Sequence, residues 1–282
     1  MNATGPAQRP ATYVALGKRR YRVAHVADPA LDGLSDLALC GETIVVLRRQ
    51  VPELVLLHPD GGLTGETAEL AQFACGHGLR SLGDGRLAAT DMDGHKIALL
   101  DDTLRETARL HCDERPGLGR PFNHPCDCTV GPDGRLYVAD GYGNSAVHIF
   151  GPDLAHIRSF GQPGRGPGEF STPHSILIDG RNRLCVADRE NNRVQRFDTN
   201  GTWLDEITGL HKPMALALTP DGLLLVSDQT PRLSAYDAAG RLVGRCRTFS
   251  TYGHGLAVTG NGTIAIAEMS PDRVTLLIPD GA

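Results

Sequence analysis

The stretch HSILIDGRNRLCVADRENNRVQRFDTNGTWLDEIT, residues 174–208, decides the fold. It contains four short segments rich in β-branched and apolar residues. They are separated by the turn at Asp179-Gly180, the loop RENN and the turn DTNG. Segments of about five residues bounded by Asp, Asn and Gly are typical of antiparallel hairpins. The stretch therefore predicts a four-stranded antiparallel unit.

The same unit recurs along the chain, because a short apolar strand ending in an acidic residue appears five times. These strands read LAATD, LYVAD, LCVAD, LLVSD and IAIAE, and they end at Asp91, Asp140, Asp188, Asp228 and Glu268. A sixth copy, IVVLRR, ends at Arg49 instead. Repeats of several short strands every 40 residues or so are typical of propeller blades. The sequence predicts an all-β fold, a single six-bladed β-propeller domain over residues 11–282.

The two ends of the sequence are expected to complete the ring. The segment RVTLLIPDGA (273–282) corresponds to the third strand of the last blade, and YRVAHVA (21–27) can supply its fourth strand. Such an N-terminal strand closes the propeller and removes a free sheet edge. Residues 1–10, MNATGPAQRP, are polar and contain proline, so we expect a flexible N-terminus that lacks the apolar region of a signal peptide.

Composition argues against several classes of protein. A formal charge of −5 offers no basic surface for nucleic acid, and no apolar stretch of about 18 residues exists to span a membrane. The seven cysteines include no C-x-x-C pair, which favours reduced thiols and a cytoplasmic location. Cys126 and Cys128 are either soft metal ligands or, as we favour, part of the core or channel wall. Nothing in the sequence indicates the oligomeric state.

Histidines occupy one register position in every second repeat. Fourteen residues before the end of the second strand stand His77, His174 and His254 in the even repeats, whereas the odd repeats carry Ser35, Cys126 and Met214. In a closed ring the three imidazoles would surround the central axis. Three neutral imidazoles with an open fourth position are typical of catalytic zinc sites, and imidazole suits Zn, Fe, Cu and Ni. We predict one Zn²⁺ per chain; the alternative is three hydrogen-bonded channel histidines.

The loop after each second strand returns to the mouth that holds the histidines. It supplies Arg49 and Arg189, whose guanidinium groups can each hold a carboxylate with two N–H donors. It also supplies Tyr142, a phenol whose pKa a metal ion and nearby cations would lower, so that it could act as a base. The competing interpretations are a salt bridge between Arg189 and an acidic neighbour, and a stacking role for Tyr142. The same loops contribute Met92, Gln229 and Met269.

Two segments resemble the peptidyl-α-hydroxyglycine α-amidating lyase family, whose members are six-bladed propellers of NHL repeats. They read NHPCDCTVGPDGRLYVADGYGNSAVHIF (123–150) and GPGEFSTPHSILIDGRNRLCVADRENNRVQRF (166–197), and weaker likeness extends to GHGLRSLGDGRLAATD (76–91) and YGHGLAV (252–258). The resemblance implies that His77, His174 and His254 bind zinc. It also implies catalytic roles for Tyr142, Arg189 and Arg49. If the alignment of the first blade is shifted by one residue, Arg48 takes the place of Arg49.

The sequence departs from the family at several positions. Gly255 stands where the family places an aspartate that binds a structural calcium, so the Ca²⁺ site loses its support. Tyr252 replaces a methionine two residues before the third histidine, and with Arg48 and Met269 it is a candidate to contact substrate. Gly143 and Arg196 replace family cysteines, so the family's two disulfides lack partners here.

The resemblance implies a zinc-dependent lyase that cleaves the C–N bond of an α-hydroxyglycine derivative to an amide and glyoxylate. Because Tyr252 alters the substrate pocket, we expect a small N-acyl- or N-substituted α-hydroxyglycine, that is, a small-molecule carboxylate, as substrate. Two alternatives remain: another zinc-dependent hydrolase or lyase acting on a small carboxylate, and a non-catalytic NHL interaction module. The module would carry no metal and would present a broad basic or apolar face.

Overall fold

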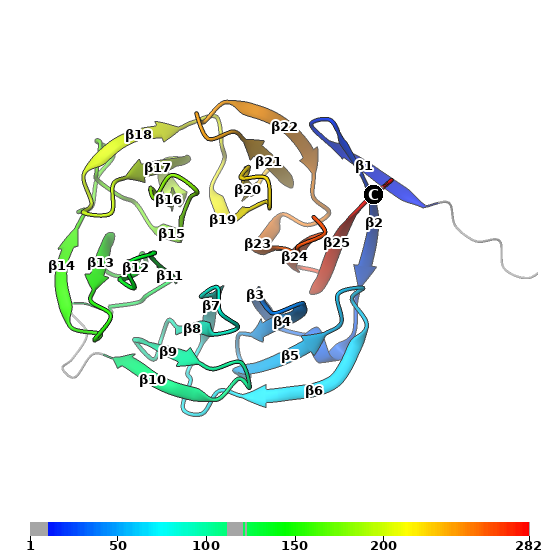
Figure 1. Ribbon diagram of the computed structural model, residues 1–282, viewed down its shortest axis with the longest axis horizontal. Helices are drawn as coiled ribbons and strands as arrows, with labels where there is room; N and C mark the ends of the chain where they lie inside the picture. The colour runs from blue at the N-terminus through cyan, green and yellow to red at the C-terminus, as the bar shows by residue number, and fades with distance from the viewer. Residues whose placement is uncertain (1–10, 112–120, 122, 282) are drawn as a thin grey trace, which may run out of the picture.

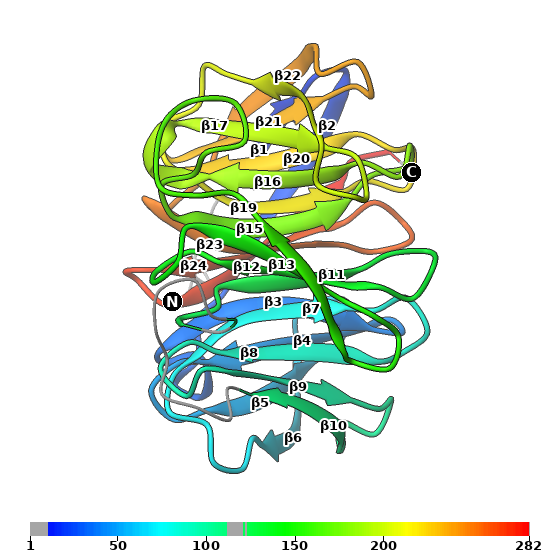
Figure 2. The same cartoon turned by 90° about the vertical axis from the view of Figure 1, so that its left-hand side faces the viewer.

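The computed structural model describes residues 11–111, 121 and 123–281, and it shows six antiparallel sheets arranged in a ring (Figure 1). The predicted all-β, six-bladed propeller is confirmed. In the side view the first strands of neighbouring blades lie beside one another (Figure 2), and each contacts the next around the axis. The N-terminal segment 1–10, expected to be flexible, lies outside the described residues. No helix in the described part of the chain is both long and apolar enough to cross a membrane.

Each blade contributes four consecutive strands, except the last. Blade one contains β3 (Leu34–Cys40), β4 (Thr43–Arg48), β5 (Glu53–Leu57) and β6 (Leu63–Glu69); blade two contains β7 (Gly76–Ser81), β8 (Leu87–Asp91), β9 (Lys96–Leu100) and β10 (Glu106–His111). Blade three contains β11 (Asp127–Val130), β12 (Leu136–Asp140), β13 (Ala146–Phe150) and β14 (His156–Phe160); blade four contains β15 (Pro173–Ile178), β16 (Leu184–Asp188), β17 (Arg193–Phe197) and β18 (Trp203–Ile207).

Blade five contains β19 (Pro213–Leu218), β20 (Leu224–Asp228), β21 (Arg232–Tyr236) and β22 (Leu242–Arg247). Blade six draws on both ends of the chain, in the order β23 (Tyr252–Val258), β24 (Ile264–Met269), β25 (Arg273–Pro279), β2 (Arg19–Val26) and β1 (Thr12–Leu16). Two short 3₁₀ helices, η1 (Pro29–Leu31) and η2 (Arg189–Asn191), lie between strands.

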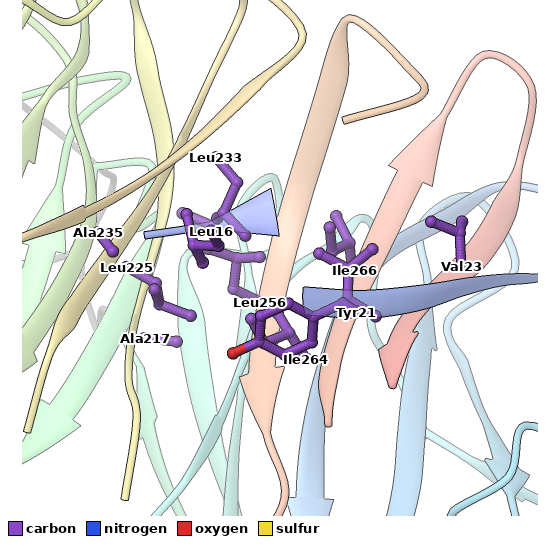
Figure 3. Close-up of a cluster of buried hydrophobic side chains, with 12 residues drawn as sticks. Leu16, Tyr21, Val23, Ala217, Leu225, Leu233, Ala235, Leu256, Ile264 and Ile266 are labelled. Atoms are coloured by element: carbon purple, nitrogen blue, oxygen red, sulfur yellow. The ribbon is translucent and has the colours of Figure 1, made fainter. Parts of the chain in front are cut away.

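The predicted closure by an N-terminal strand is confirmed, and a second strand extends it. β2 pairs antiparallel with β25, from Tyr21 opposite Pro279 to Val26 opposite Val274. The sequence did not predict β1, which pairs with β2 as a fifth strand and approaches β22 of blade five. Leu16 and Tyr21 from these strands join the buried apolar cluster between blades five and six (Figure 3). Burying this apolar surface fastens the N-terminal hairpin across the last joint of the ring.

In blades two to six the acidic residue at the end of the second strand is buried and holds the loop that leads into the first strand. Asp91 accepts the backbone amides of Ala74 and Cys75, both at 2.8 Å, and Asp188 accepts the amide of Ser171 at 2.7 Å. The other three acids also accept backbone N–H groups: Asp140 from Asn123 and His124, Asp228 from His211, and Glu268 from Phe249. A buried backbone N–H needs such a partner. The repeated acid therefore fixes where each first strand, and any histidine on it, begins.

Candidate metal centre

The three register histidines meet at the axis of the ring. The ring centroids of His77, His174 and His254 are 4.8 to 4.9 Å apart in every pairing, and one ligand nitrogen of each lies within 4.8 Å of the others. All three are buried. Within the described residues this is the one group of three or more His, Cys, Asp or Glu side chains close enough to share an ion.

A local irregularity of the strand aims each imidazole at the axis. The pairing of β15 with β16 shifts register between Pro173 and Ser175, and that of β23 with β24 shifts between Gly253 and Gly255. The pairing of β7 with β8 shifts similarly between Gly76 and Leu79. A β-bulge inserts one extra residue and redirects its side chain. The histidine in each shift thus projects from the end of its strand toward the centre.

The odd blades orient the imidazoles that the even blades supply. His77 Nδ1 bonds the carbonyl of Cys126 at 2.8 Å, and His174 Nδ1 bonds the carbonyl of Met214 at 2.8 Å. The Ser35 carbonyl approaches His254 and partly opposes the lowering of its pKa by burial, but His254 Nδ1 has no hydrogen-bond partner among the described residues. We call Ser35, Cys126 and Met214 the odd-blade residues. A carbonyl that accepts Nδ1–H fixes the tautomer and leaves Nε2 free to bind a metal ion.

The triad has the chemistry of a metal site. Burial lowers the pKa of His77 and His254 well below 6.5 and that of His174 to about 3, with further lowering by the neighbouring imidazoles or arginines. The rings are therefore neutral at pH 7, the form that binds metals. His174 Nε2 is buried and has no hydrogen-bond partner among the residues that the structure describes, and an ion at the centre of the triad would supply one. The residues present fit a metal ion held by three imidazoles.

The predicted mouth residues lie directly against this triad. The hydroxyl of Tyr142 is 3.2 Å from His77 Nε2 and accepts a hydrogen bond from Arg189 Nη1 at 3.0 Å. Arg49 Nη2 is 3.1 Å from His254 Nε2. Arg189 also pairs with Glu190 through Nε at 3.0 Å, so the salt bridge considered from the sequence coexists with the contact to Tyr142. A phenol and two guanidinium groups thus surround the open side of the triad.

The pKa of Tyr142 differs from the sequence expectation. Burial raises it, and the lowering by Arg189 and Arg49 is smaller than this effect. Although 39% of the residue's surface is exposed at the mouth, its hydroxyl faces inward to His77, so burial governs the titrating atom. The sequence argument relied on the charge of a metal ion together with the arginines and did not include desolvation. The arginines therefore do not bring the pKa of Tyr142 below its usual value, and lowering it would need the charge of a metal ion.

The other predicted contact residues lie nearer the rim. Arg48 is directed away from the triad, since its guanidinium bonds the Asp32 carbonyl at 3.0 Å and Glu53 at 2.9 Å. This resolves the one-residue ambiguity in favour of Arg49 as the arginine beside the histidines. Tyr252 and Met269 are cross-strand partners at the mouth end of blade six. Tyr252 is 41% exposed there.

The side chains of the odd-blade residues hold the mouth loops, a role that the sequence did not indicate. Ser35 Oγ donates to the His77 carbonyl at 2.8 Å and accepts from Arg49 Nη2 at 3.0 Å. The Cys126 sulfur packs against Gly141, where an added Cβ would meet it at 2.8 Å. The Gln229 side-chain amide lies 3.2 Å from the Met214 sulfur. The shared register position is the sequence signal for this role, because Ser35, Cys126 and Met214 all occupy it.

No cysteine in the described part of the chain belongs to the histidine group. Burial raises the pKa of both Cys126 and Cys128, so each remains a thiol. Cys128 packs in an apolar cluster between blades two and three, as the favoured core interpretation predicted. Cys185 faces Arg196 across β16 and β17, the position expected for a missing disulfide partner. Every cysteine in the described part of the chain is free.

An arginine lies in the channel beneath the triad, and the residues there do not fit a calcium ion. Arg80 of blade two donates to Asp127 of blade three, to Ser175 Oγ at 3.2 Å and to the Leu216 carbonyl at 3.1 Å. A side chain at Gly255 would meet Asp36 Oδ1 at 2.1 Å. Asp36 therefore fills the place where the family carries its aspartate. Both carboxylates are engaged by backbone amides, and the guanidinium supplies the positive charge.

Replacing Arg80 with leucine is expected to destabilise the whole ring. Asp127 would be left as a buried charge without a cation, and breaking such a pair costs about 3–5 kcal/mol. Urea unfolding measured by fluorescence should show this loss, with Arg80→Lys recovering part of it. Arg241→Ala, which removes an exposed pair with Asp237, is the control and should leave the midpoint unchanged. An unchanged midpoint in Arg80→Leu would show that the guanidinium does not hold the blades together.

Acid should destabilise the protein when a chelator is present. The folded-state pKa of each triad histidine is lowered, so below pH 6.5 the unfolded chain binds protons that the folded protein does not. This contribution to stability is therefore complete above pH 6.5 and is lost as the pH falls toward about 3. The loss is about 1.4 kcal/mol per pH unit for each histidine. Urea titrations in EDTA at several pH values should show a shallower slope for His174→Gln and an unchanged slope for the exposed-site control His58→Gln.

Comparison with known proteins supports the resemblance seen in the sequence. A family described as a 6-bladed beta-propeller matches residues 130–222. The chain is similar to peptidyl-glycine alpha-amidating monooxygenase of Mus musculus, with 38% identity over 137 residues, 45% of this chain and 14% of that protein. It is also similar to a probable peptidyl-alpha-hydroxyglycine alpha-amidating lyase of Caenorhabditis elegans, with 29% identity over 222 residues, 72% of this chain and 63% of that protein.

The NHL character of the repeats is confirmed as well. NHL repeat-containing protein 3 of Mus musculus is 33% identical over 175 residues, 56% of this chain and 50% of that protein. The chain spans less than two thirds of the length of each of these relatives. Among solved structures, a streptogramin B lyase superposes with a TM-score of 0.64 at 14% identity over 92% of this chain and 88% of that chain. At that identity the likeness shows a shared fold alone.

Proposed function

We propose that this protein is a metal-dependent lyase that cleaves the C–N bond of an N-acyl- or N-substituted α-hydroxyglycine, giving an amide and glyoxylate. The observation that carries the proposal is the position of the Tyr142 hydroxyl, between His77 Nε2 and Arg189 Nη1 at the open side of the triad. Relatives named as amidating lyases support the same reaction class. The substrate is a small carboxylate in this proposal, and neither nucleic acid nor a membrane takes part.

The metal would be held by His77, His174 and His254, and Zn²⁺ is the ion we propose. Three neutral imidazoles with one open position are its usual catalytic ligand set. When bound, the ion would supply a Lewis acid that polarises an oxygen of the substrate. The carbonyls of Cys126 and Met214 hold two of the imidazoles in the tautomer that this requires.

The protein's own side chains bind and orient the substrate. Arg49 and Arg189 provide cationic donors beside the triad. Such donors suit the substrate carboxylate, which is bonded directly to the reacting carbon. Fixing that carboxylate sets the orientation of the C–N bond relative to Tyr142 and lowers the entropic part of the barrier. Arg189 donates from Nε to the Glu190 carboxylate, and this contact leaves Nη1 directed at the Tyr142 hydroxyl.

Tyr142 is placed to take the proton of the substrate hydroxyl. Loss of that proton lets the C–OH become the aldehyde C=O of glyoxylate while the C–N bonding electrons pass to nitrogen. The nitrogen then gains a proton and leaves as the amide, so protons and electrons balance without an oxidant or reductant. Proton transfer by a positioned side chain typically contributes about 10²- to 10⁴-fold to the rate.

The direct test is glyoxylate release from α-hydroxyhippurate by protein reconstituted with zinc. We expect stoichiometric formation of benzamide and glyoxylate that stops when the metal is removed and resumes when it is restored. A protein that takes up the metal yet releases neither product would favour the alternative, another zinc-dependent hydrolase or lyase. A non-catalytic NHL interaction module predicts neither metal nor turnover. A cytoplasmic location, proposed from the free cysteines, can be checked by cell fractionation.

A further inference from the structure

Three mouth residues occupy the same place in the three odd blades. Each directly follows the second strand of its blade and contacts the odd-blade residue of that blade: Arg49 contacts Ser35, Gly141 contacts Cys126 and Gln229 contacts Met214. The backbone is fixed alike, because Arg49 N bonds the Gly33 carbonyl at 2.7 Å and Gln229 N bonds the His211 carbonyl at 2.9 Å. Blade one thus presents an arginine to the mouth, blade three presents Tyr142 beside its glycine, and blade five presents Gln229.

The contact with Met214 sets the orientation of the Gln229 amide. A thioether sulfur can only accept a hydrogen bond, so the group that faces it at 3.2 Å is the NH₂. The carbonyl oxygen, Oε1, makes no hydrogen bond to any of the described residues. Gln229 is half-buried, and Met214 is buried with its carbonyl on His174. Gln229 Oε1 is therefore an uncharged acceptor, and Met214 connects its side chain to His174.

The substituents of the reacting carbon match the side chains at the mouth. The carboxylate calls for cations, which Arg49 and Arg189 supply, and the hydroxyl calls for a proton acceptor, which Tyr142 supplies. The remaining polar group on that carbon is the amide N–H. It requires a neutral acceptor, since a carboxylate side chain there would repel the substrate's own charge. Gln229 Oε1 is such an acceptor.

We propose that Gln229 is a specificity-determining residue that accepts the N–H of the scissile amide. The inference rests on the proposed function and names its substrate class: secondary amides, that is N-acyl-α-hydroxyglycines with a free N–H. Esters of the same shape and N-methylated amides are disfavoured. Holding the N–H also orients the nitrogen that leaves when the C–N bond breaks.

Two stable ligands isolate this hydrogen bond. Hippurate carries the carboxylate and the N–H but no hydroxyl, so it binds without reacting, and O-benzoylglycolate replaces the N–H by an ester oxygen. Calorimetric dissociation constants on the zinc-loaded protein should show hippurate binding about tenfold more tightly, the size expected for one net hydrogen bond. In Gln229→Leu the two affinities should become equal, through weaker hippurate binding, while the ester binds as before.

The control is Gln50→Leu, at an exposed position one residue beyond Arg49, which should keep the tenfold preference. A preference that survives in Gln229→Leu, or one that is missing from the wild type, overturns the proposal. Equal weakening of both ligands in Gln229→Leu also overturns it, because that result means that Gln229 only supports Met214. These outcomes are separate from the fate of the proposed function, which fails if wild-type protein releases no glyoxylate from α-hydroxyhippurate.

Discussion

Replacing His174 with alanine is expected to remove the bound metal and with it all measurable lyase activity, while the ring stays folded. Two imidazoles are too few for a tight site, and the substitution also frees the Met214 carbonyl that oriented the lost ring. The fold should survive because the blades are held by their own apolar clusters and by Arg80, neither of which involves His174. Metal content after dialysis and a circular dichroism melt measure the two effects separately.

His77→Ala and His254→Ala should behave like His174→Ala, since the three rings are almost equidistant. His58→Ala, at an exposed position, serves as the control for nonspecific metal uptake. If one equivalent of metal remains on His174→Ala, the ion lies elsewhere and the triad is a hydrogen-bonded channel group.

Tyr142→Phe is expected to lower kcat by about 10²- to 10⁴-fold and to leave the metal content unchanged. The substitution removes the hydroxyl that contacts His77 and Arg189 but keeps the ring that packs beside them. Because the carboxylate contacts remain, KM should change little. Steady-state kinetics of glyoxylate release, with metal analysis of the same sample, provide the measurement. Tyr13→Phe, at an exposed tyrosine of β1 outside the mouth, is the control and should keep kcat.

Arg189→Ala should act mainly on KM, in contrast to the effect of Tyr142→Phe on kcat. A large rise in KM is expected because a hydrogen bond to a charged group contributes about 1.5–3 kcal/mol. Full turnover in Tyr142→Phe together with normal substrate binding by Arg189→Ala would rule out the lyase mechanism. A hydrolase on the same triad would then be the better description.

The fold and the position of the triad could be predicted because the repeat makes them local properties. An acid at the end of the second strand and a histidine fourteen residues earlier belong to one hairpin, whose length is set by its turn. The turn glycines at 85, 134, 222 and 262 all have positive φ, as the Asp-Gly and Asn-Gly pairs required. Blade four differs only in that Asn182, rather than Gly180, adopts this conformation.

The remaining features depend on contacts between blades, which one repeat cannot reveal. Strand β1 is stabilised by β2 and by the neighbourhood of β22, so the segment TYVAL alone gives little indication of it. Arg80 reaches across three other blades, and Ser35 contacts a carbonyl in the next blade. The pKa of Tyr142 depends on how deeply the hydroxyl is buried, a quantity that follows from the assembled mouth and not from the list of charges.

Blade six, built from both ends of the sequence, also determines when the metal centre can form. His254 lies on β23. The sheet that contains β23 is complete only when β2, from the N-terminal part of the chain, pairs with β25 from the C-terminal part. His77 and His174 lie in blades two and four, whereas the third imidazole comes from the blade that closes the ring. Chains truncated before His254 are therefore expected to keep only two imidazoles and to hold the metal weakly.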